Sequence, residues 1–505
     1  MSRITVDIDL NRVEGDLEFQ VDLEDGVVVD ARCVGTLYRG FEQIMIGRAP
    51  RDALVITPRV CGICGTAHLY AATLALEQIA HITPPAHAVQ VRNLCLMAET
   101  LQSDLRQSFL FFTPDFCNAI YAAHPLAAEL RDAFTPLKGS VVRGTLKATR
   151  DVLGIVALFG GQWPHSTYML PGGISQPANS RRILDSRGIL AAVRAWFEQS
   201  VIGGRLEEWM ALDSADALFR WQAAAGGRER SALGLFNRFS RDIGLHRLGR
   251  GTGHLLSYGV NPQPLSEARE LPAGFFNADT QQIETLDQSQ INEHVRHSWF
   301  LDYPGGRHPW EGETIPDHQP GSDRYTWAKA PRYGDKVVQT GPLAELRIAG
   351  EPLISDLLAR EGDNTWLRQF ARLRRAGWLI GAMSETLQAI KASMDQPHYI
   401  DPGIDVWPDG ESYGLVEAAR GGLGHWLRIR NGVIDKYQIV TPTAWNASPR
   451  DSAGRHGHWE QSIIGLPVPD PANPVDIGHI VRSHDPCLVC TVHFIGSQRK
   501  THFNV

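Results

Sequence analysis

Near its start the chain alternates apolar and polar residues. The alternation runs from Leu17 to Leu23 and resumes at Val27, after the sequence Glu24-Asp25-Gly26. Alternation puts every second side chain on one face of a strand, and Asp-Gly is typical of a tight hairpin turn. A β-hairpin is therefore predicted within residues 3–36. Further strands are predicted over residues 255–258, 282–285, 425–429 and 434–440, the last two as a hairpin through Asn431-Gly432.

Most of the chain instead repeats apolar residues at intervals of three and four positions. Leu94, Met97, Leu101 and Leu105 are an example. This interval places side chains on one side of an α-helix, and it predicts a helix over residues 88–112 with an apolar, core-facing side. Further helices are predicted over residues 140–158, 186–210, 213–225, 229–242 and 364–395, and one from the first cysteine pair to Ile79.

The segment 250–345 differs from the helical parts. Short strand-like pieces alternate there with Gly/Pro-rich coil, and the segment is dense in Trp and Tyr, such as Trp299 and Trp327. We interpret it as a loop-rich insertion packed on a helical body. Residues 37–50 are expected to form a loop or short helix, and residues after 440 a loop-rich tail. The whole pattern predicts a mainly helical α+β fold with small peripheral sheets.

Composition narrows the function classes. The 505 residues carry a net charge of −7 and 43% hydrophobic residues. An acidic chain gives no electrostatic reason to expect nucleic acid or an anionic membrane surface as a partner. No apolar run is long enough to span a membrane, and the N-terminus shows no signal-peptide core. We expect a soluble protein of a reducing compartment, in the cytoplasm or on the cytoplasmic side of the membrane, unless a partner carries an export signal for it.

Two cysteine pairs lie at opposite ends of the chain. Cys61 and Cys64 form the first pair, and Cys487 and Cys490 form the second. Two residues between cysteines let both sulfurs reach one metal. A zinc site of four cysteines is one interpretation, but such pairs usually lie about 15–20 residues apart. Because a shared site must bring both ends together, we expect residues 1–505 to form one interlocked unit.

The residues flanking the pairs decide between these interpretations. The motif R-x-C-G-x-C-x-x-x-H begins at Arg59, and D-P-C-x-x-C-x-x-H begins at Asp485. Both resemble the large, catalytic subunit of [NiFe] hydrogenases, and the resemblance implies that family's mainly helical α+β fold. Further matching segments are Arg12–Gly15, Arg39–Glu42, Pro164–Ser166, Trp327–Tyr333, Gly341–Leu343, Glu417–Gly421, Pro442–Asn446 and Pro449–Asp451.

The resemblance implies a metal centre of nickel and of iron carrying one carbon monoxide and two cyanides. Cys61 and Cys487 would be terminal nickel ligands, and Cys64 and Cys490 would bridge the two metals. Arg420 would donate to one cyanide and Thr443 to the other. Pro442 would form part of an apolar wall around them.

The implied reaction is heterolytic cleavage of H2, in the uptake direction, to protons and electrons. A nickel-bound thiolate such as Cys487 can accept the proton, and Glu14 would carry it outwards. Arg420 is a competing base, although a guanidinium is hard to deprotonate. Asp115 and Asp485 would lie near the metals and orient Arg420 and water.

A second metal and a partner are also implied. Glu42 and His493 resemble the ligands of a magnesium-type ion, for which carboxylate oxygen is suited. No cluster of cysteines remains for an iron–sulfur centre, so electrons would pass to a cluster-bearing small subunit in an obligate heterodimer. His165 resembles the position that approaches the nearest of those clusters.

Some features depart from respiratory members of the family. Residues 102–110 lack the histidines frequently found there, and Ala419 stands where a proline usually precedes the arginine. Phe111–Asp115 resembles the cytoplasmic uptake and hydrogen-sensing branch. Residues 494–505 resemble an extension that an endopeptidase removes during maturation, after maturation proteins have supplied the metals. Three alternatives stay open: a hydrogen sensor that signals to a kinase, a quinone-binding subunit of related fold, and a structural zinc protein.

Overall fold

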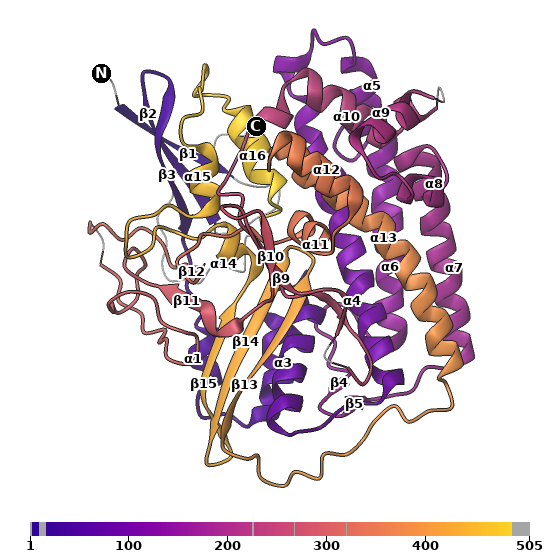
Figure 1. Ribbon diagram of the computed structural model, residues 1–505, viewed down its shortest axis with the longest axis vertical. Coiled ribbons are helices and arrows are strands. Elements are labelled where there is room, and N and C mark those ends of the chain that lie inside the picture. The colour runs from indigo at the N-terminus through magenta and orange to yellow at the C-terminus, as the bar shows by residue number, and fades with distance from the viewer. Residues whose placement is uncertain (1–2, 10–16, 225–226, 267, 320, 487–505) are drawn as a thin grey trace.

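The computed structural model describes residues 3–9, 17–224, 227–266, 268–319 and 321–486. Long helices stand side by side in one part of the molecule, and sheets with shorter helices form the other part (Figure 1). This arrangement confirms the predicted mainly helical α+β fold with small sheets.

The helical part consists of α4 (Ala86–Arg106), α6 (Ser140–Gly160), α7 (Ser180–Trp196) and α13 (Thr365–Ala392). Helix α13 packs against α4 and α7, and α6 packs against the same two helices. The side chain of Asn364 caps α13 at its N-terminus. None of the described helices is both long and apolar enough to cross a membrane. Helix α13 also buries four arginines, which are Arg368, Arg372, Arg374 and Arg375.

The other part is built on an antiparallel sheet of β13 (Gly410–Ala418), β14 (Gly421–Arg430) and β15 (Val433–Val440). Helix α3 (Gly65–Ile79) packs on this sheet and follows the first cysteine pair directly. A two-residue turn, Ala419-Arg420, joins β13 to β14. The start of α3 and this turn both lie at the boundary with the long helices. Side chains from the two parts of the molecule therefore meet at this boundary.

A second antiparallel sheet lies near the N-terminus. It contains β1 (Arg3–Asp9), β2 (Leu17–Glu24) and β3 (Val27–Gly35), so the predicted hairpin is confirmed and gains a strand. Two helices from the end of the described chain, α15 (His458–Ile463) and α16 (Val475–Ser483), share an apolar core with this sheet. The two ends of the described chain are therefore neighbours.

Shorter elements complete the fold. The shorter helices are α1 (Phe41–Met45), α2 (Ala53–Ile56), α5 (Ala127–Phe134), α8 (Leu206–Met210), α9 (Ala215–Ala223), α10 (Ala232–Asp242), α11 (Pro342–Ile348), α12 (Pro352–Glu361) and α14 (Pro442–Asn446). The shorter strands are β4 (Met169–Leu170), β5 (Gly173–Ile174), β6 (Leu255–Ser257), β7 (Val260–Pro262), β8 (Arg269–Leu271), β9 (Gly274–Asn277), β10 (Gln282–Glu284), β11 (Ile291–His294) and β12 (Ala330–Tyr333).

Two predicted helices are shorter and more irregular than expected. The helix predicted over 88–112 leaves the α-helical form after Arg106 and continues as the π-helical segment Gln107–Phe112. The helix predicted over 186–210 begins earlier, becomes π-helical over Phe197–Ile202, and is separated from α8. A π-helical turn keeps the apolar spacing nearly continuous, so spacing alone does not reveal it.

Strand β13 and helices α15 and α16 were not predicted. Residues of β13 are buried on both faces towards its end, because α3 covers one face of the sheet and neighbouring loops the other. A strand buried on both faces does not alternate apolar and polar residues. The segment after residue 440 is rich in Gly and Pro, and its short helices lie between those residues.

Candidate metal centre

Cys61 and Cys64 lie in the loop that leads into α3. Both are buried, and the backbone N–H of Ile63 donates to Cys61 Sγ at 3.4 Å. Arg39 holds the loop from outside by donating to the carbonyl oxygen of Val60 at 2.6 Å. Buried sulfur ligands on a loop fixed at its base are suited to a soft metal ion.

A line of aromatic side chains runs from this loop into the sheet. Nδ1 of His68 lies 3.0 Å from Nε2 of His425, whose Nδ1 lies 2.8 Å from the hydroxyl of Tyr437. Burial lowers the pKa of His68 to about 4, against the opposing effect of Cys61, and lowers the pKa of His425 well below its ordinary value. Both rings are therefore neutral at pH 7, and each can accept or donate a single hydrogen bond per nitrogen.

His165 touches the same loop from the other side. Its Nδ1 lies 2.9 Å from the carbonyl oxygen of Pro58, three residues before Cys61. The side chain is half-buried, so it reaches both the cysteine loop and the surface. Its role beside a partner stays a prediction.

Arg420 lies in the turn between β13 and β14. The next residue, Gly421, has a φ of 124°, and a Cβ there would lie 2.3 Å from Thr340 Oγ1. Glycine is therefore required for the close packing of this turn. The guanidinium of Arg420 is buried and donates through Nε to Asp485 at 3.1 Å. Asp485 comes two residues before Cys487.

Helix α14 (Pro442–Asn446) contains the other two residues predicted to surround the cyanides, Pro442 and Thr443. Its cap is Thr441, whose side chain accepts a backbone N–H at 3.2 Å. Thr443 is buried. The amide of Asn446 accepts from the backbone N–H of Thr340 at 3.0 Å and donates to its carbonyl oxygen at 3.2 Å. Thr340 thus contacts both α14 and the turn that carries Arg420.

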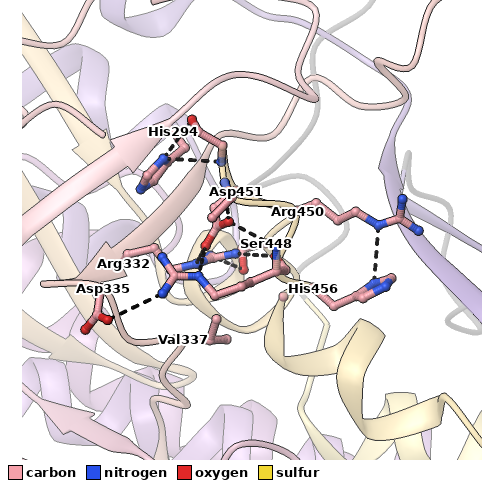
Figure 2. Close-up of polar contacts among 12 residues, drawn as sticks. His294, Arg332, Asp335, Val337, Ser448, Arg450, Asp451 and His456 are labelled. Carbon is pink, nitrogen blue, oxygen red and sulfur yellow. Dashed lines mark hydrogen bonds and ion pairs between the residues drawn. The ribbon is translucent and has the colours of Figure 1, made fainter. Parts of the chain in front are cut away.

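The loop after α14 is fixed by one buried ion pair (Figure 2). Arg332 on β12 donates through Nε to Asp451 at 3.0 Å, and both side chains are 0% exposed. It also donates to the hydroxyl of Ser448 at 3.0 Å. Its remaining N–H groups bind the carbonyl oxygens of Pro331, Pro449 and Arg455.

Glu42 lies at a small cavity between α1, β15 and the segment after β11. Its carboxylate accepts from the backbone N–H of Ile439 at 2.9 Å and from the hydroxyl of Thr314. Lys329 lies between Glu42 and Glu293, with its Nζ 3.4 Å from a carboxylate oxygen of each. The cavity has a volume of about 70 Å³.

The charges around this cavity are coupled. Burial, together with the nearby Glu42, raises the pKa of Glu293 to about 7, although Lys329 opposes the shift. Burial lowers the pKa of Lys329, but Glu293 and Glu42 outweigh it and raise that pKa. Two carboxylates and the amide oxygen of Gln438, which Lys329 also contacts, form a donor set of hard oxygen atoms. Such a set suits a magnesium-type ion.

Asp115 forms an ion pair with Arg482. Its carboxylate lies 2.7 Å from the guanidinium of Arg482 on α16 and 4.0 Å from Nδ1 of His479. Arg482 lies three residues before Asp485. The described contact therefore places Asp115 against the helix that leads to the second cysteine pair.

Four predicted site residues lie outside the described part of the chain. They are Glu14, Cys487, Cys490 and His493. Within the described residues, no group of three or more His, Cys, Asp and Glu side chains is placed to hold a metal ion. The described part therefore brings together Cys61 and Cys64, and separately Arg420 and Asp485, and leaves the four-thiolate set a prediction.

Comparison with known proteins decides the family. The model of the nickel-dependent hydrogenase family matches residues 39–136 and 239–493. The chain belongs to this family. It is therefore the catalytic large subunit of a hydrogenase, an oxidoreductase, and the family implies a centre of nickel and iron. Large subunits of hydrogenases generally pair with a small subunit.

Individual relatives cover nearly the whole chain. The periplasmic [NiFeSe] hydrogenase large subunit of Desulfomicrobium baculatum is 31% identical over 98% of this chain and 96% of its own. The uptake hydrogenase large subunit of Rhodobacter capsulatus is 28% identical, with coverages of 98% and 96%. The reduced Ni-Fe-Se hydrogenase of D. vulgaris Hildenborough superposes with a TM-score of 0.81 at 30% identity, over 97% of this chain and 100% of that chain.

Several residues of this hydrogenase site were missed by sequence reasoning. His425 and Tyr437 continue the His68 contact, and Arg372 on α13 lies 3.1 Å from Asp485. A sequence signal existed for α13, because four arginines in a helix with an apolar pattern need buried partners. The partners themselves lie far away in sequence, so the sequence does not name them.

Proposed function

We propose that this hydrogenase oxidises H2 in the uptake direction and passes the electrons to an iron–sulfur small subunit. The observation that carries the proposal is the buried Arg420–Asp485 ion pair, which lies two residues before the second cysteine pair, together with the buried first pair, Cys61 and Cys64. Relatives named uptake hydrogenase support the direction. The proposal includes the domain prediction that residues 1–505 form one unit, with 250–345 as an insertion.

The described donors fit the expected centre. The soft sulfur atoms of Cys61 and Cys64 would hold nickel, with Cys64 shared by iron. Arg420 and Thr443 are buried donors that would hold the cyanide groups, and Pro442 would exclude water beside the carbon monoxide. The centre, when bound, supplies the electrophile that polarises H2. Cys487 and Cys490 would complete the set of four.

The proton is proposed to leave through side chains of this chain. Cys487 accepts it at its sulfur, and Glu14 carries it outwards, because a carboxyl group accepts and releases a proton at small cost. Arg420 is held as a cation by Asp485, so its role is to donate hydrogen bonds. Asp115, through Arg482, would position the helix before Cys487.

A magnesium-type ion is proposed at the cavity of Glu42. Glu42 would bind it directly and His493 would complete the site, which would tie the end of the mature chain to the core. Glu293 and Gln438 provide further oxygen atoms near the same cavity. Lys329 would then remain beside the carboxylates that the ion does not use.

The partner, maturation and compartment remain proposals of the same kind. His165 would approach an iron–sulfur cluster of the small subunit. Maturation proteins would insert the metals, and an endopeptidase would remove residues 494–505. The proposed compartment is the cytoplasm, whereas the D. baculatum relative is named periplasmic. Cell fractionation with activity staining separates the two.

The deciding experiment is metal analysis with intact mass on the chain purified with its partner. One nickel per large subunit with iron in excess of nickel, because the partner's iron–sulfur clusters add their own iron, a mass ending at His493 and rapid H2-dependent dye reduction support the proposal. Nickel and iron with the full mass and very slow turnover indicate the hydrogen-sensing alternative. Zinc alone would contradict both functions.

A further inference from the structure

A chain of buried ion pairs leads from Arg420 into the helical part. Asp485 binds Arg420 and also lies 3.1 Å from Arg372 on α13. Arg372 lies 3.0 Å from Asp104 on α4, and Asp104 binds Arg375 through both oxygens, at 2.6 and 2.9 Å. All of these side chains are at most 6% exposed. Ion pairs this deeply buried persist only when charges balance.

The chain ends at two carboxyl groups. Arg375 donates to Oε1 of Glu345 on α11, and Glu345 lines the same small cavity as Glu417 on β13. Oε1 of Glu417 accepts from the hydroxyl of Ser257 at 3.0 Å and from a backbone N–H. Both carboxyl groups are buried, at 1% and 3% exposure. The guanidinium of Arg269 interacts electrostatically with Glu417 and donates to the Leu415 carbonyl oxygen.

The second oxygens of this pair face a small cavity. Oε2 of Glu345, Oε2 of Glu417 and Oδ1 of Asn261 are buried and have no hydrogen-bond donor among the described residues. All three residues line the same cavity of about 10 Å³. The amide of Asn261 is oriented, because its Nδ2 donates to Glu270 at 2.9 Å. Buried acceptors that line one cavity require a donor there.

The count of directly paired charges supports a proton as that donor. The chain holds four carboxyl groups, those of Asp104, Asp485, Glu345 and Glu417, against the three guanidinium groups of Arg372, Arg375 and Arg420. Arg269 stands outside this set, because it forms no ion pair with Glu417 among the described residues and donates to the Leu415 carbonyl oxygen instead. One proton makes the directly paired set neutral. Burial raises the pKa of Glu417 well above its ordinary value of 4.5, and the facing Glu345 raises it further. A cavity of this volume has room for about one water molecule.

We propose that Glu345 and Glu417 together bind one proton, and that one water molecule in the cavity donates to Asn261, which makes the pair a buried proton-storage site. The proton sits between the two Oε2 atoms, as an O–H of one carboxyl group donating to the other carboxylate. It leaves by transfer to the water and returns by the same route, so no bond other than O–H changes. The site uses none of the proposed metal ligands.

The test is infrared spectroscopy of the purified complex with its partner, at about pH 9. Glu99 and Glu293 have pKa values of about 7, so they are ionised there. The wild-type complex is expected to show the C=O stretch of a protonated carboxyl group, shifted on transfer to D2O. Glu417→Gln and Glu345→Gln should each remove this band, because the remaining carboxylate keeps no proton.

The matched control is Glu351→Gln. Glu351 binds Arg374, the residue of α13 next to Arg375, at 2.6 Å. It therefore has a cation of its own. This variant should keep the band. Absence of the band in the wild type, or its persistence in both single variants, overturns the proposal. The wild-type measurement needs no substitution and no turnover, so it remains decisive if a variant fails to assemble or if the proposed H2 chemistry is wrong.

Discussion

Two buried charge clusters of this hydrogenase differ in how completely their polar atoms are used. Arg332 and Asp451 form a closed unit, in which each of the five guanidinium N–H groups has an acceptor. In the cluster that runs from Arg420 to Glu417, the last two carboxyl groups keep oxygens without a donor among the described residues. A closed unit fixes a loop, whereas an open one retains the capacity to bind a proton.

The largest effect is expected at the closed cluster. Asp451→Ala leaves Arg332 buried without its counter-charge, and breaking a buried pair in this way costs about 3–5 kcal/mol. Thermal unfolding of the complex should show this loss. The matched control is Arg455→Ala: Arg455 also binds Asp451, at 2.8 Å, but is 40% exposed, so its removal should cost less than about 1 kcal/mol. Equal losses for both variants would contradict the comparison.

The next effect concerns the metal end of the open cluster. Arg420→Lys keeps the positive charge but loses the planar fork that binds Asp485 and that we propose also binds the metal centre. Removing one oriented donor from an active site typically lowers kcat by about 100-fold or more. H2-dependent dye reduction should fall by that factor while nickel and iron contents stay unchanged. Loss of the metals instead would show that Arg420 acts in assembly.

The sequence predicted the metal site better than the open cluster. Cys61, Cys64, Arg420 and Thr443 were found because their motifs resemble a known family. Glu417 lies within a matching segment and Glu345 lies two residues after another, but nothing in the sequence indicates that they meet, because their contact depends on the tertiary arrangement of α11 and β13. The long helices followed from apolar spacing. Strand β13 did not, because burial on both faces removes the alternation that identifies a strand.

A substitution inside the open cluster can shift its proton balance. Asp104→Asn removes one carboxylate, so three carboxyl groups then face three guanidinium groups and neutrality no longer requires a proton. The hydrogen bonds to Arg372 and Arg375 weaken, at a cost of about 1.5–3 kcal/mol. The protonated-carboxyl band at about pH 9 should disappear although Glu345 and Glu417 are both present. A band of wild-type intensity would show that the charge balance does not control the pair.

The smallest expected effect is a change in how steeply the free energy of unfolding falls with pH. Because the pKa of Glu417 is raised in the folded protein, folding takes up a proton above the ordinary pKa of 4.5. The resulting stability is fully present below that pH and is lost as pH rises through the folded pKa, by at most about 1.4 kcal/mol per pH unit. Glu417→Gln does not titrate, so its unfolding midpoint should fall less steeply with pH than that of the wild type.

The difference between the two curves isolates Glu417 from other groups. Glu99 and Glu293, whose pKa values are raised to about 7, contribute the same slope to both proteins, so their effect cancels. Urea midpoints of the complex at a series of pH values give the comparison, and Glu351→Gln should keep the wild-type slope. Parallel curves for Glu417→Gln and the wild type would mean that the open cluster binds no proton on folding. Its unpaired oxygens would then need another donor, and the contrast with the closed Arg332–Asp451 unit would rest on geometry alone.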